Sequence, residues 1–295
     1  MEVKELALLG FQISLVCTVL SYGLNAAPAD LMYLLRRPSL LARSLIAIVV
    51  VMPVVAVLMT RWLDFPLTAE VALIALAISP VPPRLPTRET RAGGHMPYAL
   101  GLMVLLTLLS VAVVPLTAYL LGAMYGRSID VPPADIALLI VKSVLVPLAA
   151  GMAIRAVSPG LAGRVVKPAA MLARVLMPLA AIALLIVVAP ALWPLTTNGS
   201  LLVIVAFLAI GFVTGHRLGG PEPEHAAVLA YATACRHPGI ALATAVTAFP
   251  DGHFGATIVL YLVTAFVLGV AYRAWNRRRA ARAGTDRRSP LDRGQ

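Results

Sequence analysis

Two short stretches, SPVPP at residues 79–83 and RHPG at residues 236–239, interrupt apolar runs that are otherwise long enough to cross a membrane. Pro82 and Pro238 lie just over half the chain apart. Proline removes a backbone donor from a helix and clashes with the preceding turn. Interruptions at corresponding places in two halves of a chain are typical of transporters whose binding site lies where the broken helices meet. The alternative is that these prolines only kink packed helices.

Composition places the interruptions in a membrane protein. Hydrophobic residues make up 60% of the 295 residues and charged residues only 13%, whereas soluble chains have about 25% charged residues. We therefore predict an all-α polytopic membrane protein with nine transmembrane helices. Each apolar run is measured against the roughly 20 residues that cross a bilayer. The predicted spans are 6–26, 43–62, 68–86, 97–122, 134–156, 170–192, 199–216, 226–249 and 255–275.

The net charge of +11 is interpreted by its location along the chain. Most Lys and Arg residues fall in alternate links and in the C-terminal tail, and such residues stay on the cytoplasmic side. The pattern predicts an outside N-terminus and a cytoplasmic C-terminus. A signal peptide over 6–26 is the rival interpretation, but its start is not positively charged. The predicted domains are a transporter domain over 1–275 and a basic, disordered tail over 276–295, with lipid rather than nucleic acid as the partner.

Several segments together resemble the bile acid:sodium symporters and their bacterial relatives. They are Gly23-Leu24 through Asp30-Leu31, Leu35-Arg36-Arg37-Pro38, Met52-Pro53, Ile78-Ser79-Pro80 leading to Gly93-Gly94, and the run from Ala232 to Pro250. The resemblance covers about residues 10–275, and it implies that the location is the inner membrane of a bacterium. It implies two inverted repeats of five helices, here 4+5 because the first helix is absent, with two crossed, interrupted helices and transport by alternating access.

The chain departs from this family at the positions that the resemblance assigns to sodium. Where the family has carboxylate, amide and hydroxyl ligands, this sequence has residues that do not suit a hard cation. These degenerate positions are Ala232 and Arg236 on the second interrupted segment, Arg84 and Leu85 on the first, and Ala99 and Met103 on the following helix. We therefore predict no coupling to sodium through these positions, and no metal or cofactor.

Arg236 is the leading site residue, because a guanidinium inside a span normally faces a bundle interior or an aqueous cavity. One hypothesis is that it supplies permanently the positive charge that sodium supplies in relatives, and holds an organic anion. The alternative is that it pairs with backbone carbonyls or reaches cytoplasmic water as a structural residue. His237 is either a carrier of a coupling proton or a neutral packing residue, and Lys142 either reaches the surface or lines the cavity. The predicted substrate-binding residues are Arg236, His237, Thr233, Ser79, Pro82, Gly239 and Lys142.

The predicted function is a secondary transporter for a small organic anion. The alternative is a non-transporting membrane protein, a sensor or scaffold, that retains the transporter fold. An enzyme is not expected, because the sequence has no His-Glu-x-x-His, Gly-x-Ser-x-Gly or phosphate-binding glycine loop. Cys17 and Cys235 both lie in apolar runs and predict buried thiols. The substrate and the oligomeric state are left open.

Overall fold

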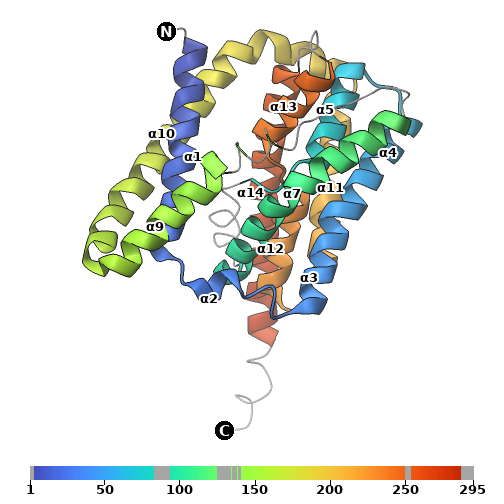
Figure 1. The fold of residues 1–295 in the computed structure, drawn as a ribbon. Helices are drawn as coiled ribbons and strands as arrows, with labels where there is room; N and C mark the ends of the chain where they lie inside the picture. Colours follow the sequence, from blue (N-terminus) through green and yellow to red (C-terminus); the bar gives the residue numbers. More distant parts are fainter. Residues whose placement is uncertain are drawn as a thin grey trace.

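The computed structural model describes residues 3–82, 94–124, 141–249 and 254–286, together with positions 134 and 138. This part of the chain is helical and contains no strand (Figure 1). Its helices are α1 (Val3–Asn25), α2 (Pro28–Leu31), α3 (Pro38–Leu45), the π-helix η1 (Ile46–Val51), α4 (Met52–Trp62), α5 (Leu67–Ile78), α7 (Met96–Met124), the π-helix η2 (Val141–Leu145), α9 (Val146–Val157), α10 (Pro159–Thr197), α11 (Ser200–Leu218), α12 (Pro223–Ala234), α13 (Pro238–Ala248) and α14 (Gly255–Asp286).

Five helical stretches in the described residues are long and apolar enough to cross a membrane, so the chain is a multi-pass membrane protein. They are Pro38–Trp62, Met96–Leu116, Pro159–Val187, Ser200–Leu218 and Gly255–Arg279. The predicted third and eighth spans are not among them, because α5 ends at Ile78 and α12 ends at Ala234, which leaves each helix short. The count of nine spans and the inverted repeats stay predictions.

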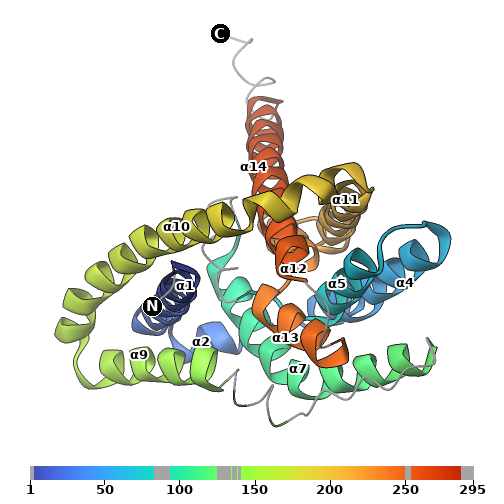
Figure 2. The ribbon, with the colours of Figure 1, turned by 90° about the horizontal axis from the view of Figure 1, so that it is seen from above.

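One group of helices is formed by α1, α9 and α10, and Figure 2 shows α1 enclosed between the other two. Close packing of α1 on α9 depends on glycine. A Cβ added to Gly151 would lie 2.5 Å from the carbonyl oxygen of Leu20, and one added to Gly23 would clash with the carbonyl oxygen of Leu148. The second group contains α4, α5, α7 and α11 to α14, and α10 connects the two groups by packing on both α1 and α14.

The two predicted interruptions lie side by side. Ser79 has extended backbone at the end of α5, and Cys235, Arg236 and His237 separate α12 from α13. The backbone N–H of His237 donates to the carbonyl oxygen of Pro80 at 2.8 Å. This bond joins segments that are far apart in the sequence. The residues that follow the first interruption, 83–93, lie outside the described part of the chain.

The end of the chain differs from the prediction of a disordered tail from residue 276. Helix α14 continues through this position to Asp286. The segment after residue 272 is rich in arginine and alanine, both strong helix formers, so the helix extends beyond its apolar part. Arg277, Arg278 and Arg279 are exposed on this extension. Residues 287–295 lie outside the described part.

Candidate functional site

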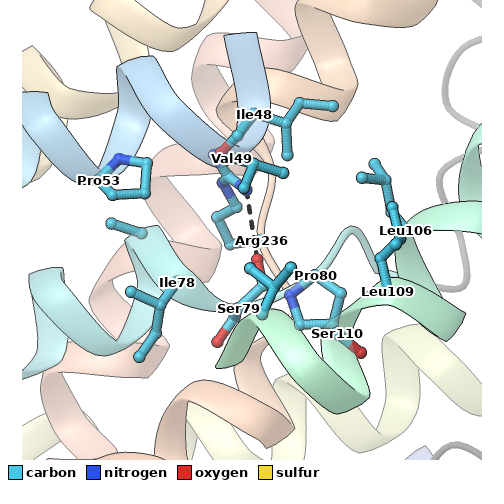
Figure 3. Close-up of a pocket in the computed structure, with 12 residues that line it drawn as sticks. Ile48, Val49, Pro53, Ile78, Ser79, Pro80, Leu106, Leu109, Ser110 and Arg236 are labelled. Atoms are coloured by element: carbon cyan, nitrogen blue, oxygen red, sulfur yellow. Dashed lines mark hydrogen bonds between the residues drawn. The ribbon is translucent and has the colours of Figure 1, made fainter. Parts of the chain in front are cut away.

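Arg236 lies in the interruption between α12 and α13 and is only 2% exposed. Its Nη2 donates to the carbonyl oxygen of Ile48 in η1 at 2.9 Å, and its Nη1 donates to the carbonyl oxygen of Ser79 at 3.3 Å (Figure 3). The guanidinium therefore connects three segments: the second interruption, the first interruption and η1. A cavity of about 20 Å³, the size of roughly one water molecule, lies beside it.

The free carbonyl of Ile48 follows from the local sequence. In a π-helix the backbone N–H of each residue bonds to the carbonyl five residues earlier. Five residues after Ile48 comes Pro53, which has no backbone N–H. The carbonyl oxygen of Ile48 is therefore left without its helical donor, and Arg236 supplies one.

Tyr261 on α14 completes the second interruption. The backbone N–H of Arg236 donates to the Tyr261 hydroxyl at 2.5 Å, and that hydroxyl donates to the carbonyl oxygen of Ala234 at 3.2 Å. Tyr261 is 1% exposed. One hydroxyl thus satisfies a donor and an acceptor that the broken helix exposes, as buried backbone groups require.

The positive charge of Arg236 is not neutralised by these contacts. Both side-chain acceptors are neutral carbonyls, and the Nε atom has no hydrogen-bond partner among the described residues. Arg236 forms no salt bridge with a residue in that part of the chain. A buried cation is strongly unfavourable unless an opposite charge compensates it. Arg236 therefore pairs with backbone carbonyls, as the structural hypothesis expects. Its charge also stays unneutralised, as the anion-binding hypothesis expects.

His237 begins α13 as its N-cap. Its Nδ1 accepts a hydrogen bond from the backbone N–H of Ile240 at 3.3 Å. An accepting Nδ1 places the proton of the neutral ring on Nε2. Protonation would turn Nδ1 into a donor and remove the cap, so this geometry favours a neutral histidine over a proton carrier. Gly239 makes room for the ring, since a Cβ there would lie 3.2 Å from Cε1 of His237.

A cavity of about 750 Å³ opens against the second interruption. This volume is within the usual range for a bound organic molecule. Most of its surface is apolar, and none of the described residues that line it is acidic. Its lining comes from α1 (Phe11, Leu15), Pro82, α10 (Arg174, Met177, Pro178, Ala181, Ile182, Leu185), the region from Tyr231 to Pro238 (Tyr231, Cys235, Arg236, His237, Pro238) and α14 (Val259, Tyr261, Leu262, Val263, Ala265, Phe266, Gly269, Arg273).

The structure brings only some of the predicted substrate-binding residues to this cavity. Arg236, His237 and Pro82 line it, and Ser79 is joined to Arg236 through its carbonyl. Thr233 is fully buried, and its hydroxyl has no partner among the described residues. Lys142 is exposed in η2 and is not among the described residues that line the cavity.

The positions that the resemblance assigns to sodium do not offer a ligand set. Ala99, Met103 and Ala232 are fully buried in the apolar core, and none has a side-chain oxygen. Arg84 and Leu85 lie outside the described residues. No group of three or more His, Cys, Asp or Glu within the described ranges is arranged to hold a metal ion. The side chains of Ala99, Met103 and Ala232 therefore do not fit a sodium ion, because such an ion is held by several oxygen ligands.

Sequence reasoning missed four contributors to the site. Tyr261 and Ile48 act on Arg236 from distant helices, and Arg174 and Arg273 line the cavity. In the sequence, both arginines were interpreted only as residues that set the orientation in the membrane. Pro53 signalled a carbonyl without a helical donor, but in an α-helix that carbonyl belongs to Val49, and only the π-helix η1 moves it to Ile48.

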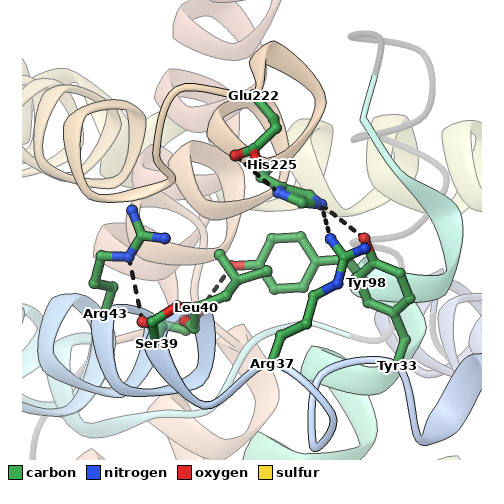
Figure 4. Close-up of polar contacts among 9 residues, drawn as sticks. Tyr33, Arg37, Ser39, Leu40, Arg43, Tyr98, Glu222 and His225 are labelled. Carbon is green, nitrogen blue, oxygen red and sulfur yellow. Dashed lines mark hydrogen bonds and ion pairs between the residues drawn. The ribbon is translucent and has the colours of Figure 1, made fainter.

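A second polar cluster brings Tyr33, Arg37, Glu222 and His225 together (Figure 4). The charge pattern of the sequence predicts that this part of the chain is cytoplasmic. Nε2 of His225 is 2.9 Å from the Tyr33 hydroxyl and 3.4 Å from Nη1 of Arg37, and its Nδ1 is 3.4 Å from Glu222. The ring of His95 stacks on Tyr33 with centroids 4.5 Å apart. Burial, and then the charge of His225, lower the pKa of His95 below its ordinary value.

These features define a class: a multi-pass, all-helical membrane protein with a ligand-sized cavity against two adjoining helix interruptions. A model of the Sodium Bile acid symporter family matches residues 12–209, about two thirds of the chain. The chain therefore belongs to this family of membrane transporters, which confirms the resemblance seen in the sequence. The match ends within α11, before the interruption that contains Arg236. No curated protein matches the chain.

Proposed function

We propose that the chain is a secondary carrier of an organic anion that works by alternating access and is not coupled to sodium through the positions that the resemblance assigns to it. The observation that carries this proposal is Arg236, whose guanidinium has no acidic partner among the described residues and which helps to line a cavity with no acidic lining in its described part. An anion entering the cavity would supply the missing negative charge. The apolar lining would hold the rest of the molecule.

The charge of Arg236 supports independence from sodium. In a sodium-coupled carrier, bound sodium brings the positive charge that permits an anion to bind. Here a tethered cation is held by two backbone carbonyls, which are ligands of the kind that hold a metal ion. The carrier therefore has its cation in every step of the cycle. Ala99, Met103 and Ala232 fit this proposal, since they provide no side-chain ligand for a second cation.

The experiment is a thermal-shift screen of purified protein against taurocholate, dodecanedioate and short carboxylates and sulfonates, in choline buffer. A ligand present at a concentration of one hundred times its Kd raises the free energy of unfolding by about 2.7 kcal/mol. We expect at least one anion to stabilise the wild type, and Arg236→Gln to weaken that binding at least tenfold. Arg236→Lys keeps the charge and should weaken binding less. Arg164→Gln is the matched control, because Arg164 is exposed on α10 and is not among the described lining residues.

Two outcomes would contradict this proposal. One is unchanged anion binding by folded Arg236→Gln, and the other is no stabilisation of the wild type by any anion. The rival function is a non-transporting scaffold in which Arg236 is only a structural tie, and its carbonyl contacts favour that role. Uptake of the stabilising anion into proteoliposomes decides between the two. A carrier accumulates the anion until it equilibrates, whereas a scaffold leaves the rate at that of empty liposomes.

A further inference from the structure

Arg174 and Arg273 line the same cavity as Arg236 but come from two different walls. Arg174 is exposed on α10, and Arg273 is half-buried on α14. Neither has an acidic partner among the residues that the structure describes. Figure 1 shows α10 and α14 running in opposite directions, and Arg174 is the first lining residue of α10 while Arg273 is the last of α14. The two arginines therefore lie toward the same end of the cavity.

That end is distant from Arg236. The hydroxyl of Tyr261 contacts the backbone of Arg236, and Arg273 follows Tyr261 by twelve residues on the same helix. A helix rises 1.5 Å per residue, so the two positions on α14 are about 18 Å apart. The side chain of a helical residue leans toward the helix N-terminus, which brings the guanidinium of Arg273 somewhat nearer to Arg236.

The wall between the two ends is apolar. On α14 it consists of Leu262, Val263, Ala265 and Phe266, and on α10 of Met177, Pro178, Ala181 and Ile182. Arg236 and His237 thus stand at one end of an apolar cavity, and Arg174 and Arg273 stand at the other. No acid is among the described lining residues, so the arginines at both ends are available to bind a negatively charged group of a ligand.

We propose that Arg174 and Arg273 form a second anion subsite, and that the ligand is an elongated organic dianion with an acidic group at each end of an apolar body. This inference rests on the proposed function, which supplies the first subsite at Arg236. Each guanidinium presents a planar fork that binds a carboxylate or sulfonate through two hydrogen bonds. The methylene body of the ligand is stabilised by burial of its apolar surface along the wall.

The experiment compares dodecanedioate with its monomethyl ester by isothermal titration of the purified full-length chain. The two ligands share one body and differ by a single charge. We expect the dianion to bind the wild type at least tenfold more tightly than the ester. Arg174→Gln and Arg273→Gln should each remove most of this difference and leave the affinity for the ester within twofold. Arg164→Gln, which removes an exposed charge from the same helix as Arg174, should change neither affinity.

Equal affinities for the two ligands, or no binding of dodecanedioate, would overturn the second subsite. A preference for the dianion that survives both Arg174→Gln and Arg273→Gln would overturn it as well. The ester separates this failure from failure of the proposed function, because the ester needs only the first subsite. Suppose that Arg236→Gln abolishes binding of the ester, but the wild type binds the dianion no more tightly than the ester. The first subsite, and with it the proposed function, is then supported, and the second subsite is refuted.

Discussion

The guanidinium of Arg236 donates to the carbonyl oxygen of Ile48 at 2.9 Å, and these residues belong to segments far apart in the sequence. The bond exists because Pro53 leaves that carbonyl without a helical donor. A second carbonyl, that of Ser79, completes the tie at 3.3 Å. Two backbone carbonyls thus hold a cation where the two helix interruptions meet. This cation is a side chain of the protein and not a bound metal ion.

Pro53→Ala tests the origin of this tie. The alanine N–H would compete with Arg236 for the carbonyl oxygen of Ile48 and weaken a hydrogen bond to a charged group, which contributes about 1.5–3 kcal/mol. Pro147→Ala is the matched control, because Pro147 stands two residues after η2 as Pro53 stands two residues after η1. We expect Pro53→Ala to unfold at a lower temperature than Pro147→Ala. Equal unfolding temperatures would count against the role given to Pro53.

Tyr261→Phe removes the hydroxyl that bridges the second interruption. The N–H of Arg236 and the carbonyl of Ala234 would lose their partner in a buried place, at about 1–3 kcal/mol for each unsatisfied group. Tyr231→Phe is the control, since its hydroxyl is buried as well and donates to the carbonyl of Gly269, outside the interruption. Thermal unfolding of both variants should show the larger loss for Tyr261→Phe. A smaller loss there than for Tyr231→Phe would refute the bridging role.

Gly151→Ala tests the packing of α1 on α9. The added methyl group would lie 2.5 Å from the carbonyl oxygen of Leu20, and backbone must move to admit it. Overpacking of this kind costs about 1–3 kcal/mol. Gly163→Ala on α10 meets nothing within 4 Å and should be neutral or slightly stabilising, because alanine favours a helix. Unfolding midpoints that fall together for the two variants would contradict this packing.

The pH dependence of stability tests the cluster around His95. Its lowered pKa means that the folded protein binds fewer protons at this residue than the unfolded chain. The stabilising effect is therefore present above the ordinary pKa of 6.5 and is lost as the pH falls below it. Besides Tyr33 and His225, the charged groups near His95 are Arg37, Glu224 and Asp30.

We expect the unfolding temperature of the wild type to decrease as the pH is lowered from 7.5 to 5.5, which is roughly one unit either side of the ordinary histidine pKa. His95→Gln cannot take up the proton and should show a smaller fall. The carboxyl of Glu222 does not titrate in this pH range, because a backbone hydrogen bond holds its pKa below 4.5. A midpoint that rises toward pH 5.5 in the wild type would have the wrong sign for this account.

The sequence was sufficient to predict the helical membrane class and the two interruptions, because apolar length and clustered prolines are local signals. It also predicted that Arg236 lies inside the fold. It left open whether Arg236 pairs with carbonyls, since the partner carbonyl of Ile48 lies on another helix and becomes free only through Pro53. Contacts between distant helices depend on packing that a single sequence does not specify.

The cavity was the least predictable feature. Its lining combines residues of α1, α10, α12 and α14, and their facing sides follow from helix rotation and crossing. Arg174 and Arg273 looked like residues of membrane orientation, whereas both line the cavity. Lys142, for which the sequence left both the surface and the cavity wall open, lies exposed in η2. The extension of α14 to Asp286 was missed because a polar, basic segment was interpreted as disorder rather than as a helix.

The most direct test of the central claim is the affinity of the wild type for its stabilising anion in sodium buffer and in choline buffer of the same ionic strength, measured by isothermal titration. If Arg236 supplies the cation, the two dissociation constants should agree within about twofold, a difference of about 0.4 kcal/mol. A dissociation constant at least tenfold lower in sodium, about 1.4 kcal/mol of coupling, would contradict the account.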